Sequence, residues 1–253
     1  MRPRRAPRGR GVGLAAAGTA RVTLHRFFVE PAELIGDAFP LPASIDHQVT
    51  RVLRLRDGEE LLLLDGLGAE VLCRLEPGGR LRVVARGESS GEPHHRLTIC
   101  QALLKGDGLE RVVQQGTELG VAAFRLFVSE RCVVRQLSPG RLDRLKAIAR
   151  ESAEQSERGV VPEIDPPVPF ASVLGPGGVL LFERAQGGEP RLSALEPPTS
   201  LIIGPEGGFS PAEVEAARQA GIQMATLGPR ILRAESVALA AAAVVLSRAG
   251  DFA

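Results

Sequence analysis

The chain has 253 residues, and its 44% hydrophobic content is enough to build one large core or two modest ones. Its longest apolar stretch, residues 237–246, is mostly alanine and half as long as the roughly 20 residues of a membrane-spanning helix, so we expect no transmembrane segment. The net charge is +1, and five arginines lie within the first ten residues, which leaves a net charge of −4 for the remainder. A strongly basic nucleic-acid-binding surface is therefore excluded, and any RNA site must be a local patch.

Residues 1–23 form a predicted disordered, basic tail. Its first twenty residues contain no acidic residue and many glycines, alanines and prolines, a composition that cannot build a core. Glycine interrupts the weakly apolar stretch 11–20, so the segment does not resemble a signal peptide, and we expect a cytoplasmic protein. The tail either adds nonspecific attraction to RNA or is dispensable.

Residues 24–90 are predicted to form a small β-rich domain. Asp57-Gly58, Asp65-Gly66 and Pro77-Gly78-Gly79 separate short apolar segments, as turns separate strands. The expected strands are residues 26–29, 61–65, 70–75 and 81–84. Residues 87–95 contain two glycines, two serines and a proline, which is typical of a linker.

Residues 91–253 alternate between strand-like runs and helical patterns. The expected strands are residues 97–104, 124–129, 179–183, 200–203 and 224–227. The expected helices are residues 109–119, 138–157, a segment that begins at Ser210, and residues 235–249. This alternation predicts an α/β domain with a mostly parallel sheet.

The three cysteines, Cys73, Cys100 and Cys132, lie far apart in the sequence. They form no C-x-x-C pair and have no histidine at ligand spacing, so the sequence suggests neither a metal site nor a disulfide framework. We expect reduced thiols in the core.

A glycine-rich loop, residues 204–208, follows the strand at 200–203. Ser210, Pro211 and Glu213 then supply an N-cap, a first-turn proline and a capping-box glutamate. Glycine lets the backbone approach a ligand closely, although such a cluster is also compatible with a simple tight turn. No lysine follows the glycines and Glu206 would repel phosphate, so a nucleoside with a positive sulfonium, S-adenosylmethionine, fits better.

A second loop, residues 227–236, leaves a short strand through Gly228-Pro229 and enters the last helix. Arg230 and Arg233 lie three residues apart in it, and arginine is suited to binding a phosphate or a base edge in planar geometry. The alternative is that both are surface arginines paired with Glu235.

Seven sequence strings carry a specific resemblance. LIIGPEGGFS, LGPRILRAES, TELGV with SERCVVR, EQSERGVVPEI, HRFFVE and VTRVLRLRDGE occur in an order that resembles the ribosomal RNA small-subunit methyltransferase E family, across about residues 24–251. The resemblance implies the SPOUT class: an α/β domain ending in a trefoil knot, an N-terminal PUA-like β-barrel and a homodimer. It also implies S-adenosylmethionine-dependent methylation of N3 of a uridine in 16S ribosomal RNA, either free or in the small ribosomal subunit.

The same resemblance assigns a cofactor site to the knot loops. The implied cofactor-binding residues are Leu181, Phe182, Glu183, Ile203, Gly204, Pro205, Glu206, Gly207, Gly208, Leu227, Gly228, Ile231, Leu232 and Ser236.

For catalysis we expect Arg233, supported by Arg230, to favour the negative charge that uracil acquires when N3 loses its proton. Glu235 and Glu206 are candidate proton acceptors, and bulk water is a third. For RNA binding we expect a positive cluster in the β-rich domain, formed by His25, Arg26, His47, Arg51, Arg54 and Arg56. The alternative is that Arg51 and Arg54 line the solvated face of a short helix.

Two departures from the family pattern leave other functions open. Ala234 and Ser236 stand in a string where relatives commonly have R-T-E-T, and Gln115 stands where many have lysine. One alternative is therefore a noncatalytic RNA-binding ribosome-assembly factor. Another is a SPOUT methyltransferase for a different base or for a ribose.

Overall fold

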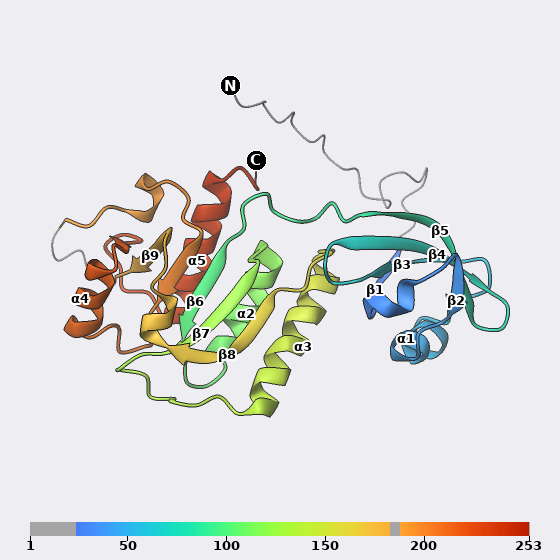
Figure 1. Cartoon of the computed structure of the whole chain (residues 1–253), viewed down its shortest axis with the longest axis horizontal. Coiled ribbons are helices and arrows are strands. Elements are labelled where there is room, and N and C mark those ends of the chain that lie inside the picture. The colour runs from blue at the N-terminus through green and yellow to red at the C-terminus, as the bar shows by residue number, and fades with distance from the viewer. Residues whose placement is uncertain (1–23, 183–187, 253) are drawn as a thin grey trace, which may run out of the picture. The chain divides into compact units, whose positions relative to one another are not determined.

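The computed structural model describes residues 24–182 and 188–252, and Figure 1 traces the path of the chain. The chain folds into two compact units. Of the described residues, the first unit contains 24–92 together with the segment Glu157–Val160, and the second contains Pro93–Ser156, 161–182 and 188–252. The basic tail at 1–23 and Glu183, both of which carry predictions, lie outside the described residues.

The first unit is built on a five-stranded sheet with the order β1-β3-β4-β5-β2. Its strands are β1 (His25–Phe28), β2 (Ala38–Pro40), β3 (Glu60–Leu64), β4 (Ala69–Glu76) and β5 (Arg80–Glu88). The four expected strands are confirmed, and β1 pairs in parallel with β3 while the other neighbours are antiparallel. The three-residue edge strand β2 was not expected, because it ends in Pro40, which cannot donate a ladder hydrogen bond.

Short helical turns complete the first unit. They are η2 (Pro31–Leu34), α1 (Ala43–His47) and the π-helical turn η3 (Gln48–Val52). Leu34, Ile45 and Val49 are buried from these turns and join the core cluster that the sheet forms with Phe27, Leu61, Leu63 and other residues. Turns of four or five residues are too short to show a helical hydrophobic period, so the sequence pattern did not reveal them.

The second unit contains a six-stranded sheet in which every pairing is parallel, with the order β11-β9-β10-β6-β7-β8. Its strands are β6 (Thr98–Ala102), β7 (Ala123–Val128), β8 (Glu163–Pro169), β9 (Gly178–Leu181), β10 (Ser200–Ile203) and β11 (Gln223–Ala225). The predicted mostly parallel sheet is confirmed. Strand β8 was not expected because it contains three prolines, which an edge strand tolerates.

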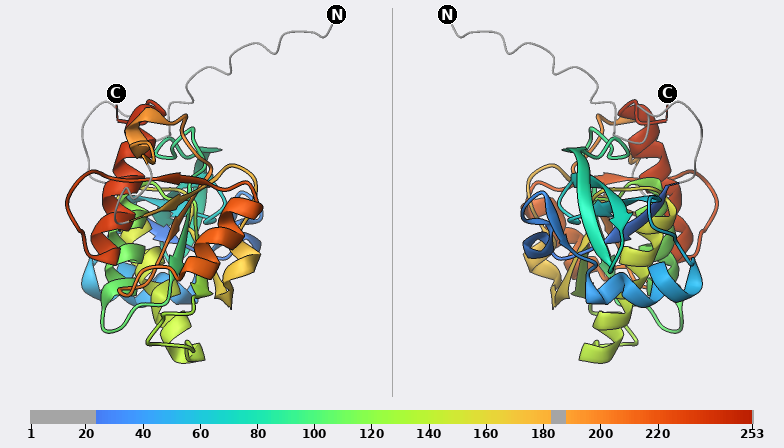
Figure 2. Two further views of the ribbon diagram at one scale, coloured as in Figure 1. Left: turned by 90° about the vertical axis from the view of Figure 1, so that its left-hand side faces the viewer. Right: turned by 90° about the vertical axis from the view of Figure 1, so that its right-hand side faces the viewer.

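Four helices cover this sheet. They are α2 (Gly108–Leu119), α3 (Pro139–Gln155), α4 (Pro211–Gln219) and α5 (Ala234–Arg248). Helix α2 contacts both α3 and α5, and Figure 2 shows α4 on the opposite side of the sheet from α2 and α5. Both faces of the sheet are thus covered, as a parallel sheet with nearly continuous apolar strands requires. The one-turn helices η4 (Phe170–Val173) and η5 (Leu192–Ala194) lie in the connections.

Local sequence explains where these helices begin and end. Helix α2 ends at Gly120, whose φ is +103° and where an added Cβ would lie 2.3 Å from Pro93 Cγ, so glycine is required there. Helix α4 begins with the predicted capping box, in which Ser210 Oγ accepts from Glu213 N at 3.3 Å and Glu213 Oε2 accepts from Ser210 N at 2.9 Å.

Three phenylalanines join the glycine-rich loop to the core of the second unit. Phe209 follows the loop directly, and its ring centroid lies 5.5 Å from that of Phe170 and 6.5 Å from that of Phe127. Burial of these rings fixes the end of the loop to the sheet. No helix in the described part of the chain is long and apolar enough to cross a membrane.

The cysteines are free and buried, as expected. Burial raises the pKa of the Cys73 and Cys100 thiols to about 11, against the weaker opposing effects of Arg86 and Arg125.

We therefore predict that neither thiol reacts with a disulfide reagent in the folded protein at pH 8, and that both react once the chain is unfolded. Because the unfolded thiols ionise first, their contribution to stability is complete below pH 9 and is lost as the pH rises towards 11. Thermal melts from pH 8 to pH 11 measure that loss; rapid labelling of Cys100 at pH 8 would contradict the prediction.

Candidate functional site

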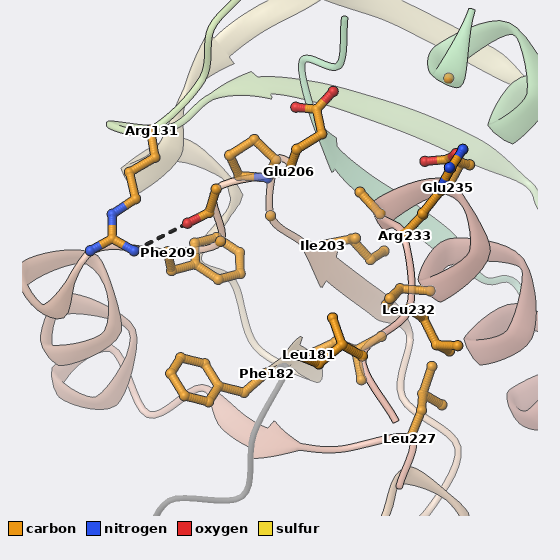
Figure 3. A pocket seen from close by; sticks show the side chains of 18 of the residues that line it. Arg131, Leu181, Phe182, Ile203, Glu206, Phe209, Leu227, Leu232, Arg233 and Glu235 are labelled. Atoms are coloured by element: carbon orange, nitrogen blue, oxygen red, sulfur yellow. Dashed lines mark hydrogen bonds between the residues drawn. The ribbon is translucent and has the colours of Figure 1, made fainter. Parts of the chain in front are cut away.

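A cavity of about 1120 Å³ opens at the carboxyl end of the parallel sheet in the second unit. The segments that follow strands β6, β7, β9, β10 and β11 all contribute to its wall, and Figure 3 shows the interior. Open parallel sheets bind ligands at this edge. The volume slightly exceeds the ~300–1,000 Å³ typical of a site for one small molecule, so the cavity has room for a cofactor and part of a second reactant.

One side of the cavity is apolar. Leu181 and Phe182 come from the end of β9, Ile203 from the end of β10, and Leu227 and Leu232 from the loop after β11. In Figure 3 these side chains surround the lower and central part of the cavity, while Glu206, Arg233 and Glu235 lie along its upper part. An apolar wall of this kind suits a flat heterocycle, and the polar side suits charged groups.

The glycine-rich loop is packed tightly and tied to two neighbouring loops. A Cβ on Gly204 would lie 3.1 Å from the Phe209 ring, and Gly208 has a φ of +65°, so both positions favour glycine. The Glu206 carboxylate accepts a hydrogen bond from the backbone N–H of Lys105 at 3.0 Å. The Arg131 guanidinium donates to the carbonyl oxygen of Gly207 at 3.1 Å, the dashed line in Figure 3.

The second loop carries the two predicted arginines. Gly228 has a φ of +121° and donates to Thr226 Oγ1 at 2.9 Å, which sets the bend. Arg233 occupies the N-cap position of α5, and both Arg230 and Arg233 are exposed. Neither guanidinium forms an ion pair with Glu235 or with any other residue of the described ranges 24–182 and 188–252. The alternative of arginines paired with Glu235 therefore has no support in the structure.

Most of the predicted site residues meet in this cavity. Its wall includes the predicted catalytic residues Arg230, Arg233 and Glu235. It also includes the predicted cofactor-binding residues Leu181, Phe182, Ile203, Gly204, Pro205, Glu206, Gly207, Gly208, Leu227, Gly228, Ile231 and Leu232. Ser236 is exposed in the first turn of α5 and is absent from the wall, and Glu183 lies outside the described residues.

Sequence reasoning missed the contribution of two other loops. Lys105 and Asp107 in the loop after β6, Arg111 in the first turn of α2, and Arg131 after β7 also line the cavity. Their signal was their position directly after strands of one parallel sheet, whose carboxyl ends meet at one edge. Of the two departures from the family pattern, Ala234 is buried in the wall, whereas Gln115 is exposed on α2 and is absent from it.

The predicted RNA-binding residues lie in the first unit. His47, Arg51, Arg54 and Arg56 are exposed, whereas Arg26 is largely buried and paired with Glu157 at 3.1 Å. His25 is partly buried on β1. Arg51 lies in η3, but Arg54 lies beyond its end with a φ of +54°, so the two do not share one regular helix face.

The known proteins that this chain resembles are RNA methyltransferases. Sequence profiles of an RNA methyltransferase domain and of an RNA methyltransferase PUA domain match residues 91–246 and 49–86. The ribosomal RNA small subunit methyltransferase E of a Synechocystis strain is 33% identical over 225 residues, which cover 84% of this chain and 74% of that protein. The chain belongs to the ribosomal RNA small subunit methyltransferase E family.

Further members of this methyltransferase E family extend the match to nearly full length. The Bacillus subtilis protein of the same name is 31% identical over 245 residues, which cover 88% of this chain and 96% of that protein. The crystal structure of the Neisseria gonorrhoeae protein bound to S-adenosyl methionine has a TM-score of 0.78 at 30% identity and covers 88% of this chain and 97% of that one. These matches confirm the SPOUT-type α/β architecture and the PUA domain expected from the sequence.

Proposed function

We propose that the protein transfers a methyl group from S-adenosylmethionine to N3 of a uridine in 16S ribosomal RNA. The observation that carries the proposal is the cavity at the sheet edge, where an apolar wall and a glycine-rich loop face two arginines that have no described ion-pair partner. Family membership and the bound S-adenosyl methionine of the Neisseria relative support the choice of cofactor.

The residues of the cavity fit this cofactor. Leu181, Ile203 and Leu227 offer apolar surface to an adenine ring, and the glycine backbone permits close approach of the nucleoside. The Glu206 carboxylate complements a sulfonium charge and would repel a phosphate. When bound, the cofactor supplies a methyl group on a positively charged sulfur.

The protein's own contribution to transfer is position and charge. In-line displacement requires the uracil nitrogen to be held close to the methyl group and aligned with it. Arg233, supported by Arg230 three residues before it, favours the negative charge that spreads over N3 and the flanking carbonyl oxygens of uracil. Glu235 lines the same side of the cavity and is the proposed proton acceptor.

The first unit is proposed to hold the RNA through exposed cations. We predict that replacing Arg51, Arg54 and Arg56 together by glutamine weakens RNA binding. The slope of log Kd against log salt concentration should fall by up to about 3, because each arginine that pairs with a phosphate displaces roughly one counterion from the RNA. Filter binding from 50 to 300 mM salt measures this slope. The control variant neutralises three arginines on β4 and β5 of the same unit, Arg74, Arg80 and Arg82, of which Arg74 and Arg82 form ion pairs with Glu60 and Glu76. Equal effects of the two triple variants would contradict a specific RNA-binding patch at residues 51–56.

A methyl-transfer assay tests the whole proposal. The purified protein, labelled methyl donor and either free 16S ribosomal RNA or intact small subunits are combined, and the modified nucleoside is identified. We expect 3-methyluridine. A ribose-methylated or differently methylated product would favour another SPOUT activity, and RNA binding without any transfer would favour the noncatalytic assembly factor.

Family membership also supports proposals about assembly. We propose that the protein is a cytoplasmic homodimer. We also propose that the chain around residues 181–182, 203–208 and 227–236 forms a trefoil knot. The proposed domains are residues 24–90 and 91–253, after the basic tail. Ile231 and Phe252, which are 59% and 54% exposed at the two ends of α5, are apolar side chains that a second subunit would cover. Light scattering of the purified protein tests the dimer.

A further inference from the structure

The carboxylate of Glu213 does more than cap its own helix. A capping-box glutamate accepts the backbone N–H of its N-cap residue, and Glu213 does so at 2.9 Å from Ser210. It also accepts from Ser129 Oγ at 3.1 Å and from the backbone N–H of Glu130 at 2.8 Å, in the loop after β7 and more than eighty residues away in sequence. Both oxygens are therefore used, and only one of these bonds belongs to helix α4.

This network is buried. Ser129 is 1% exposed, Ser210 3% and Glu213 9%, so a missing partner could not be replaced freely by water. Burying a carboxylate removes its hydrogen bonds to water, and three donors from two separate loops replace them at Glu213.

The hydrogen-bond network of Glu213 lies at the end of the glycine-rich loop. Ser210 follows the glycine-rich loop after Phe209, and Arg131, next in sequence to Glu130, donates to the Gly207 carbonyl at 3.1 Å (Figure 3). The added Cβ of a residue at Gly207 would lie 3.2 Å from Arg131 Cβ, so the two loops are in close contact. Moving the loop after β7 would therefore move both the wall residue Arg131 and the carbonyl that it holds.

We propose that Glu213 is a positioning residue for the methyl donor: its carboxylate locks the glycine-rich loop against the loop after β7 and so sets the shape of the donor pocket. The inference rests on the proposed function, because it concerns the same pocket. Glu213 does not line the cavity and acts through Ser129, Glu130 and Ser210.

The test separates this role from helix capping. Glu213→Gln places an amide NH2 against at least one N–H or O–H donor, and Ser129→Ala removes one bond to Glu213 while leaving the capping box intact. Glu33→Gln is the matched control, because Glu33 is also a capping-box glutamate, accepting from Glu30 N at 3.0 Å, but lies in the first unit. Donor Kd by calorimetry, RNA Kd by filter binding and helix content by circular dichroism are measured for each.

We expect Glu213→Gln to weaken donor binding by about tenfold and Ser129→Ala by roughly threefold, since small displacements of positioning groups have effects of this order. RNA affinity should be unchanged, and Glu33→Gln should leave donor affinity unchanged. If Glu213→Gln and Ser129→Ala both bound the donor with wild-type affinity and showed only a lower melting temperature, the positioning role of Glu213 would be refuted, while the proposed function would stand. Failure of the wild-type protein to bind the donor would overturn the proposed function together with it.

Discussion

Replacement of Arg233 by alanine should lower kcat for methyl transfer by roughly 100- to 1,000-fold while leaving the donor Kd unchanged. Removal of one preorganised group that stabilises transition-state charge has an effect of this size. Arg233 lines the polar side of the cavity and no described residue forms an ion pair with it, so its charge is available to the substrate. Single-turnover kinetics with labelled donor measure the rate, and calorimetry measures donor binding.

Two further variants test whether position and geometry matter. Arg248→Ala removes an exposed arginine at the opposite end of the same helix and should leave the rate unchanged. Arg233→Lys retains a positive charge but loses the planar guanidinium fork, so we expect an intermediate rate. An Arg233→Ala enzyme with wild-type turnover would refute the assignment.

The regular strands and helices of this fold were predictable because their sequences carry a clear period. The five predicted strands and four predicted helices of the second unit exist with shifts of a few residues at their ends, and the capping box at Ser210 and Glu213 marks the start of α4 correctly. Strand β8 was missed because its prolines contradict strand propensity, and only its position at the sheet edge makes them tolerable.

One segment of the first unit could not be assigned to it from any local sequence pattern. Glu157–Val160, which follows α3, packs with the first unit. Arg158 is buried there and forms an ion pair with Glu92 at 2.8 Å, and a Cβ on Gly159 would collide with Ser89. These contacts join residues about 70 apart in sequence, so they depend on the tertiary fold and not on a local period.

The candidate site was predictable where glycine and proline mark loops after strands, and was missed where they do not. The loops at 204–208 and 227–236 are marked by their composition, and the structure brings them together at one sheet edge. Arg131 and Glu213 carry no such mark. Nothing in the local sequence indicates that Arg131 donates to the Gly207 carbonyl. For Glu213 the sequence indicates only a helix cap, although its carboxylate accepts from three donors.

A second large effect is expected from Gly228→Ala, which should weaken donor binding by about 100-fold. The φ of Gly228 is +121°, a conformation that residues with a Cβ rarely adopt, and an added Cβ would meet nothing within 4 Å. The strain is therefore in the backbone and not in a collision, and it costs on the order of 1–3 kcal/mol. The chain can relieve it by rotating at this residue, which displaces the following segment with Ile231, Leu232 and Arg233 from the cavity wall. Calorimetric titration with the methyl donor measures the loss.

Gly221→Ala is the control that separates a displaced pocket from a weakened fold. Gly221 lies in the same unit between α4 and β11, has a φ of +73°, and also has nothing within 4 Å of an added Cβ, but it is not part of the cavity wall. Both variants should therefore melt a few degrees below the wild type, since each kcal/mol corresponds to roughly 2–4 °C for a chain of this size. Only Gly228→Ala should lose donor affinity, because only there does relaxation of the backbone move residues that line the proposed donor pocket. If both variants bound the donor equally well, the loop at 227–236 would not form the pocket, and the placement of Arg233 beside the reacting uracil would lose its structural basis.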